Sequence, residues 1–273
     1  MNTRILAALV AIGLLQVALA DDIAEKGRAV FQKYKDTVVT VRVAVSVSDG
    51  SGSDDNGGWA NGAIVDPSGL TVVALSFLDP TGIYAKLDDQ NSPQPNVKIT
   101  SLRIIFEDGN EVPATVVLRD NDLDLAFIRP IEPPKSPLPS VDLSNSAEPK
   151  LLDNVVILSQ LGEVARRAHS AAIERIETVV DKPRHYFMVG AHRSDTILSA
   201  PVFTLEGQFI GIGAMRAIAG ATETDPSDSV LVVIVPAKDI KDGAAQAPAK
   251  AAAEPSDAPG KQDAPKKPEE AKK

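Results

Sequence analysis

Apolar and polar side chains alternate along residues 37–48, whose sequence is TVVTVRVAVSVS. Valine occupies every second position on one side of this stretch: Val39, Val41, Val43, Val45 and Val47. Successive side chains of an extended chain point to opposite faces, so this spacing places the valines together on one face. The stretch therefore predicts a β-strand with one buried face.

The residues before this strand follow a different period. Four apolar residues recur among charged ones at close to a helical spacing: Ile23, Val30, Phe31 and Tyr34. Asp21 or Asp22 is a suitable N-cap for a helix that starts here. The pattern predicts a short amphipathic helix within residues 21–36.

Short apolar runs bounded by Gly, Pro, Asn and Asp predict further strands. These runs lie at residues 62–65, 70–74, 102–106, 111–118, 152–158, 170–180, 186–189, 201–204, 208–212 and 230–235. The polar segments 49–59 and 86–98 are predicted to be loops, and a short terminal helix is expected to begin at Pro236. Many short strands of this kind are typical of all-β sandwiches and barrels.

The first twenty residues form a distinct segment. Arg4 precedes an apolar core over residues 5–15, and Ala18-Leu19-Ala20 supplies small residues at a cleavage site. This order is typical of a secretory signal peptide, and the apolar core is short for a membrane span. We expect residues 1–20 to be removed, leaving a mature chain without a membrane span. The mature chain is expected to be exported to the periplasm or the extracellular space.

Composition narrows the possible partners. The formal net charge of -9 argues against nucleic acid as a general partner. The chain has no cysteine, so no disulfide can form and stability depends on the core. Residues 242–273 consist mostly of Ala, Pro, Lys and Glu. Such a segment buries too little apolar surface to offset its chain entropy, which predicts a disordered tail.

Three groups of short motifs occur in a fixed order along the chain. They are Gly62-Ala63-Ile64-Val65-Asp66 with Gly69, then Arg119-Asp120 with Asp124-Leu125-Ala126, and finally Pro201 with Glu206-Gly207 and Gly211-Ile212. In this combination the chain resembles the trypsin-like serine peptidases, above all their HtrA/Deg branch, over roughly residues 37–240. Each motif alone is weak, and the resemblance rests on their combination.

The resemblance implies an all-β fold of the chymotrypsin type with two antiparallel barrels. The barrels are expected at residues 37–130 and 150–241, joined by a Pro-rich linker over residues 131–149. A short helix precedes them, and the disordered tail follows. Members of the HtrA/Deg branch usually carry a PDZ domain after the protease domain, but residues 242–273 are too few to form one.

The same resemblance locates the positions of a catalytic triad. Ser76 falls where the catalytic histidine would be, Asp124 falls at the aspartate, and Leu198 falls at the nucleophile. A hydroxyl cannot act as a general base near neutral pH, and leucine has no oxygen with which to attack a carbonyl. Without a histidine to orient, Asp124 is expected to cap a strand entry or to bind local amides.

The histidines lie in the wrong part of the chain for a triad of this family. All of them follow the acid in sequence: His169, His185 and His192. Trypsin-like enzymes place the base before the acid. The glycines of the oxyanion loop are also replaced, by Thr196, Ser199 and Ala200, whose β-carbons disfavour the required backbone geometry.

Two other chemical interpretations compete with a degenerate triad. Ser199 could serve as a displaced nucleophile, with His192 or a lysine as its base. The three histidines could form a metal site, but their spacings match no standard zinc pattern. No metal and no cofactor is therefore predicted.

The sequence favours a pseudoprotease that binds a protein or peptide between its two barrels. The motivation is a retained scaffold whose catalytic histidine and serine are lost. An active serine endopeptidase using Ser199 is one alternative. A structural envelope protein with residues 242–273 as its tether is another. The identity of the ligand and the oligomeric state stay open.

Overall fold

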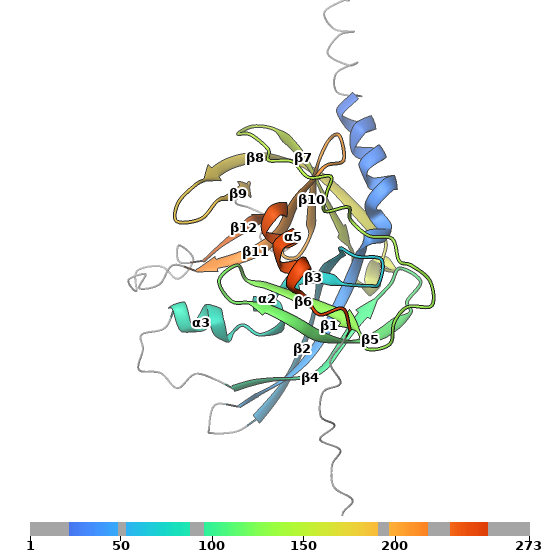
Figure 1. Ribbon diagram of the computed structural model, residues 1–273, viewed down its shortest axis with the longest axis vertical. Coiled ribbons are helices and arrows are strands. Elements are labelled where there is room, and N and C mark those ends of the chain that lie inside the picture. Colours follow the sequence, from blue (N-terminus) through green and yellow to red (C-terminus); the bar gives the residue numbers. More distant parts are fainter. Residues whose placement is uncertain (1–21, 49–52, 88–95, 191–196, 218–229, 251–273) are drawn as a thin grey trace, which may run out of the picture.

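The computed structural model describes residues 22–48, 53–87, 96–190, 197–217 and 230–250. Within them the chain forms two closed barrels of antiparallel strands (Figure 1), which confirms the predicted all-β fold. The strands of the first barrel are β1 (Val38–Ser48), β2 (Ser53–Ile64), β3 (Thr71–Ala74), β4 (Asn96–Ile105), β5 (Glu111–Asp120) and β6 (Leu125–Pro130). The strands of the second are β7 (Asn154–Gln160), β8 (His169–Val180), β9 (Tyr186–Val189), β10 (Pro201–Thr204), β11 (Phe209–Ala217) and β12 (Val230–Pro236).

Strand β1 organises the first barrel because it pairs with β2 on one edge and with β4 on the other over nearly its whole length. Val39, Val41 and Val43 are buried in the core of this barrel, as their alternation predicts. Val45 and Val47, nearer the end of the strand, are half-buried. The period-two pattern thus follows the barrel interior for the first half of β1.

The prediction of a loop over residues 49–59 is wrong for its second half. Strand β2 begins at Ser53, and its register places Asp54 opposite Val47 and Trp59 opposite Arg42. The Gly, Ser and Asp residues of this segment have low strand propensity. Pairing with the long β1 overrides that local preference. Residues 49–52 lie outside the described part of the chain.

The predicted loop over residues 86–98 needs a similar correction. Strand β4 already begins at Asn96, and helix α3 (Thr81–Leu87) ends within the predicted loop. Short helix α2 (Leu75–Leu78) follows β3 directly. The polar composition around Pro93 and Pro95 hides the start of β4, which is held by its pairing with β1. Residues 88–95 lie outside the described part.

The second barrel contains the hairpin of β10 and β11 that the sequence predicts around Gly207. Strand β11 continues to Ala217, beyond the predicted end at Ile212, because it pairs with β12 along that length. Gly211, at φ +156°, approaches β12 so closely that a β-carbon there would lie 1.8 Å from the carbonyl oxygen of Val235. Only glycine fits this crossing of the two strands.

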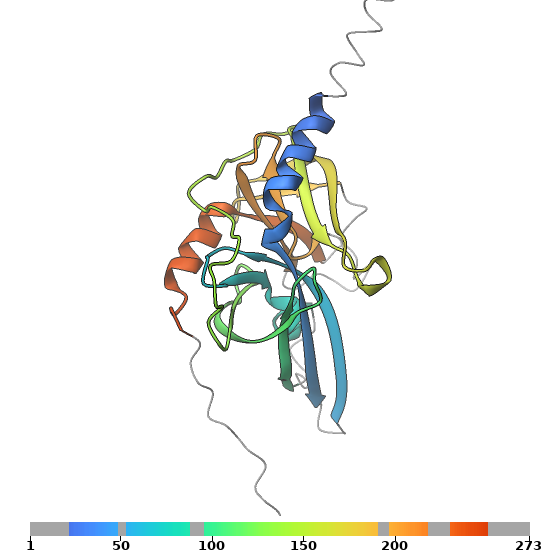
Figure 2. The same cartoon turned by 90° about the vertical axis from the view of Figure 1, so that its right-hand side faces the viewer.

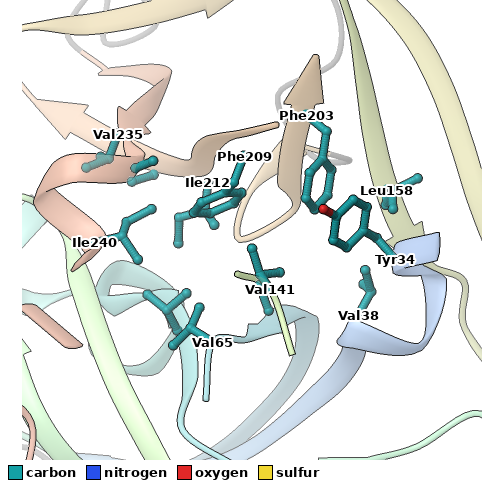
Figure 3. Packing of buried hydrophobic residues seen from close by; sticks show 14 of the residues in the cluster. Tyr34, Val38, Val65, Val141, Leu158, Phe203, Phe209, Ile212, Val235 and Ile240 are labelled. Atoms are coloured by element: carbon teal, nitrogen blue, oxygen red, sulfur yellow. The ribbon is translucent and has the colours of Figure 1, made fainter. Parts of the chain in front are cut away.

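The N-terminal helix, residues 22–34, packs against the second barrel although it precedes the first in sequence (Figure 2). The ring of Tyr34 stacks on Phe203 with 4.4 Å between ring centroids, and its hydroxyl donates to the carbonyl oxygen of Gly207 at 2.8 Å. Figure 3 shows these side chains with Val38, Leu158 and Phe209 in one apolar cluster. The predicted amphipathic helix therefore contributes its apolar face to the core between the barrels.

Helix α5 (Ala237–Gln246) closes the described chain and packs on both barrels. A β-carbon at Gly243 would lie 2.6 Å from a ring carbon of Phe127, so the helix axis lies very close to the first barrel. Arg129 Nε donates to the carbonyl oxygen of Pro248 at 2.8 Å. The ordered chain therefore continues past residue 242, where the tail was predicted to begin. The apolar contacts of Ile240, Ala244 and Ala247 explain this difference.

The remaining terminal predictions concern residues 1–21 and 251–273, which lie outside the described part. Among the described residues no helix is both long enough and apolar enough to cross a membrane.

Candidate functional site at the junction of the two barrels

The register of β3 and β6 brings Ser76 and Asp124 together. Ala74, the last residue of β3, pairs with Leu125, the first residue of β6. Helix α2 starts right after Ala74, and Asp124 lies right before Leu125. Both side chains therefore emerge at the same end of the two paired strands. Their closeness is a direct consequence of strand pairing between segments that are far apart in sequence.

Asp124 is buried, with 5% of its surface exposed, and its carboxylate accepts hydrogen bonds from Ser76 and Met215 in the described part of the chain. The backbone N–H of Ser76 donates to Oδ1 at 2.6 Å, and the Ser76 hydroxyl donates to Oδ2 at 2.8 Å. The backbone N–H of Met215 also donates to Oδ2, at 2.6 Å. A buried carboxylate needs such donors to replace its lost hydration.

These partners differ from the expectation for Asp124. The sequence predicted bonds to local amides, but Ser76 and Met215 are distant in sequence, and Met215 belongs to the second barrel. The backbone carbonyl oxygen of Asp124 accepts the N–H of Leu75 at 2.9 Å. Asp124 also has a left-handed backbone with φ +57°, a conformation that aspartate tolerates better than most residues. Its carboxylate therefore connects the two barrels.

Two arginines of the second barrel support the same connection. Arg184 forms an ion pair with the carboxylate of Asp122, and Arg216 donates to the backbone carbonyl oxygen of Asp122. The loop between β5 and β6 is thus held from the second barrel at two positions. Met215 and Arg216 could not be identified as site residues from the sequence. A backbone N–H leaves no signal in residue type, and a single arginine in a strand is common.

Leu198 and Ser199 lie on the segment that precedes β10. Leu198 is half-buried and forms an isolated parallel bridge with Gly213. Ser199 is fully buried, with a left-handed φ of +63°, and its N–H donates to the carbonyl oxygen of Gly213 at 2.8 Å. Its hydroxyl oxygen accepts the N–H of Ala74 at 2.8 Å. Ser199 thus binds Ala74 at the end of β3, the residue directly before helix α2, which contains Ser76.

The structure assigns separate partners to the two histidines that it describes. Nε2 of His169 lies 3.1 Å from the carbonyl oxygen of Val38. Nδ1 of His185 lies 2.9 Å from Oδ1 of Asp181. His192 and Thr196 belong to residues 191–196, outside the described part of the chain. The interpretation of Ser76, Asp124 and Leu198 as triad positions stays a prediction.

Comparison with known proteins agrees with this architecture. Residues 60–212, more than half of the chain, match the family model of the trypsin-like peptidase domain. The chain belongs to the trypsin-like peptidase family. A search of curated proteins found no match to it.

In a trypsin-like peptidase the buried aspartate binds the base and holds it in orientation. Here the buried Asp124 binds the hydroxyl of Ser76 and, across the barrels, the N–H of Met215. The arrangement keeps a strong polar contact at the barrel junction. Among the described residues, the donors that the structure places at this carboxylate are the Ser76 hydroxyl and the backbone N–H groups of Ser76 and Met215.

Proposed function

We propose that this trypsin-like chain binds an extended protein or peptide segment at its barrel junction and does not hydrolyse it. The observation that carries the proposal is the Ser76 hydroxyl bound to the buried Asp124 at 2.8 Å. Triad chemistry requires an imidazole in contact with that acid. A serine hydroxyl in that contact can stabilise the acid, but it cannot accept a proton from a nucleophile near neutral pH.

The size of the expected loss argues against residual catalysis. Removal of the serine or the histidine of a triad costs on the order of 10⁶ in kcat. Leu198 supplies no nucleophilic oxygen at the position that the family resemblance assigns to the serine. With both groups replaced, only background hydrolysis is expected.

The geometry of Ser199 disfavours the displaced-nucleophile alternative. Its hydroxyl is fully buried and already accepts the N–H of Ala74. An attacking oxygen must reach a substrate carbonyl and pass its proton to a base. His169 and His185 are engaged with Val38 and Asp181, and His192, the base that this alternative names, lies outside the described residues.

Strand β11 offers a surface for an extended ligand. The N–H and carbonyl of Gly213 are bound to Ala200 and Ser199, and the N–H of Met215 is bound to Asp124. Alternate residues of a strand direct their N–H and carbonyl groups to the same edge. The carbonyl of Met215 and the N–H and carbonyl of Ala217 therefore lie along the edge of β11 that faces away from β12.

This edge has no strand partner beyond Gly213 among the described residues. Helix α3 lies beside β11, but no backbone hydrogen bond joins the two in the described chain. An unpaired edge can accept an extended segment by strand addition, with backbone hydrogen bonds providing affinity. We propose that residues 215–217 form this docking edge.

The proposal extends to location and lineage. The pattern of residues 1–20 supports export by a cleaved signal peptide, to the periplasm or the extracellular space. The motifs around Asp66, Asp124 and Pro201 support descent from the HtrA/Deg branch.

Binding is tested with fluorescein-labelled β-casein, an unfolded protein with many extended segments, in the presence of the purified chain. We expect the fluorescence anisotropy to rise saturably while the casein stays intact on a gel after prolonged incubation. Ala217→Pro removes the N–H that faces the open edge and should weaken binding by about two- to tenfold, the worth of one backbone hydrogen bond. Ala217→Val keeps the N–H and is the matched control. Turnover of casein, or equal binding by all three proteins, would overturn the proposal.

The chemistry of Ser199 is tested separately by intact-mass analysis after treatment with a fluorophosphonate. We expect no adduct on the purified chain. An adduct on Ser199 would support the active-hydrolase alternative instead.

A further inference from the structure

Three side chains of metal-ligating types, from Asp36, Glu107 and His169, lie close together in the fold. Asp36 lies in the 3-10 turn η1 (Lys35–Thr37), Glu107 lies in the turn between β4 and β5, and His169 is the first residue of β8. One ligand atom from each lies within 4.8 Å of the other two. The fold brings together residues from three distant parts of the chain.

His169 is the buried member of this group, and only 4% of its side chain is exposed. Its Nε2 lies 3.1 Å from the carbonyl oxygen of Val38. A carbonyl oxygen can only accept, so Nε2 carries a proton and donates it to that bond. This bond fixes the ring with Nδ1 directed at the carboxylates.

Nδ1 of His169 has no hydrogen-bond partner, although it is buried. Its nearest charged neighbour is Oε2 of Glu107, at 3.5 Å. When the imidazole is neutral, Nδ1 carries a lone pair that faces Oε2 of Glu107. Both atoms are then hydrogen-bond acceptors, and no donor lies between them. A buried polar atom in this state calls for a partner that donates a hydrogen bond or carries a positive charge, and a metal ion is one such partner.

We propose that Asp36, Glu107 and His169 bind a divalent transition-metal ion of the zinc class. One imidazole nitrogen and two carboxylate oxygens suit zinc, and the imidazole disfavours magnesium and calcium. A ligating histidine generally donates its other N–H to a carbonyl or carboxylate, as His169 does to Val38. A fourth position would stay open to water.

The distances suit such an ion after a small movement of exposed groups. Ligand atoms around tetrahedral zinc lie about 3.3 Å apart, given bonds of about 2.0–2.1 Å. The separation of Nδ1 and Oε2, 3.5 Å, is already close to this value. The Asp36 and Glu107 side chains are each 53% exposed and can rotate toward the nitrogen. The buried ligand is fixed, and the mobile ligands are on the surface.

Lys35 is the competing cation. Its Nζ donates to Oδ1 of Asp36 at 2.8 Å and partly neutralises the cluster. Its side chain is partly exposed and can leave for solvent when a divalent ion arrives. Removal of Lys35 should therefore strengthen metal binding, whereas removal of a true ligand should weaken it. This opposition separates a metal site from a surface ion pair.

The test uses the purified full chain, freed of metal with a chelator that is then removed. Zinc titration by calorimetry should give one site per chain. At a free zinc concentration of about a hundred times Kd, the melting temperature should rise by roughly 5–10 °C. Magnesium at the same concentration should give neither effect. Cobalt in place of zinc should show the visible absorption of a four-coordinate ion.

Variants assign the ligands. Glu107→Gln, at an exposed position, should weaken zinc binding at least tenfold. Glu163→Gln removes the same charge from another exposed glutamate and should change binding by less than twofold. His169→Gln should abolish the cobalt spectrum, and Lys35→Met should tighten binding several-fold.

Three outcomes would overturn the proposal. The first is no zinc binding at one site per chain. The second is equal weakening by Glu107→Gln and Glu163→Gln, which would mean attraction to negative charge alone. The third is weaker binding by Lys35→Met, which would mean that Lys35 belongs to a structural ion pair with Asp36 and that no metal competes for it.

Discussion

The two polar junctions between the barrels differ in how fully their buried groups are paired. The Asp124 junction consists of Ala74, Ser76, Asp124, Ser199 and Met215, and each hydrogen-bonding side chain in it has a partner. The His169 junction consists of Val38, Thr40, Asn61, Gln160 and His169. Of the three buried, unpartnered side-chain atoms in the described chain, two belong to it: Nδ1 of His169 and Nε2 of Gln160.

The difference separates a junction whose buried side chains all have partners from one in which a buried side-chain atom could still bind a cation. In the Asp124 junction the acceptors are all used by fixed donors of the chain. In the His169 junction, Gln160 uses its Oε1 for Thr40 and its N–H for Asn61, each at 2.7 Å, but its side-chain nitrogen stays unpaired. Unpaired buried groups are costly and call for an explanation. A bound cation at His169 explains one of them.

The largest expected effect is at the centre of the Asp124 junction. Asp124→Asn keeps the shape and tolerates the left-handed backbone, but its amide nitrogen cannot accept from Met215 or Ser76. We expect a loss of about 3 kcal/mol in the free energy of unfolding, since hydrogen bonds to a charged, buried group are replaced by opposed donors. This corresponds to roughly 6–12 °C in melting temperature for a chain of this size.

Asp122→Asn is the matched control for this variant. Asp122 is exposed and pairs with Arg184 at the surface, so its loss should cost less than about 1 kcal/mol. Equal losses for the two variants would mean that the Asp124 junction is no more important than a surface ion pair.

The second effect concerns the contact between Ser199 and Ala74. Ser199→Ala leaves the N–H of Ala74 buried without an acceptor, which should cost about 2 kcal/mol by denaturant unfolding. Ser199→Gly loses the same bond but relieves the left-handed φ of +63°, so it should be about 1 kcal/mol more stable than the alanine variant. If neither variant is destabilised, the hydroxyl is not part of the junction and its burial needs another account.

The sequence predicts most strands of the barrels because each strand has its own local pattern of apolar residues, bounded by turn residues. The valines of β1 alternate at period two, and turn residues such as Asp66 and Gly207 mark the hairpins. Prediction failed where pairing alone holds a strand. Residues 53–59 are glycine-rich and polar, and the start of β4 is polar. Both segments are extended because each pairs with one edge of β1.

The candidate sites depend on information that residue type does not carry. Ser76 and Asp124 could be paired through family motifs, but the N–H of Met215 has no signature in sequence. Asp36, Glu107 and His169 have no metal-binding spacing, because the fold unites separate elements. The extension of helix α5 to Gln246 was not predicted for a related reason. A stretch rich in alanine buries little surface by itself, and only the fold shows that the barrels pack against it.

The third effect concerns the His169 junction, where the side-chain nitrogen of Gln160 is buried without a partner. Thr40→Val removes the hydroxyl that donates to Gln160 Oε1 and leaves the whole buried amide without a side-chain partner, which should cost about 1.5 kcal/mol. Replacing both partners, in Thr40→Val with Gln160→Leu, removes the unpaired groups together. We expect the double variant to recover most of that loss in denaturant unfolding. A double variant much less stable than the single one would show that Gln160 has a partner role that the contacts do not reveal.

The smallest effect is expected at Ser76, the residue that stands in contact with Asp124. Ser76→Ala removes one donor to the carboxylate but keeps the backbone N–H of residue 76 at Oδ1. The loss should be about 1 kcal/mol, or roughly 2–4 °C in melting temperature, because Oδ2 still accepts from Met215. The ratio to Asp124→Asn is the informative quantity. If Ser76→Ala costs as much as Asp124→Asn, the serine hydroxyl is the main support of the acid. The Asp124 junction would then depend mainly on Ser76, and the bond from Met215 across the barrels would be secondary.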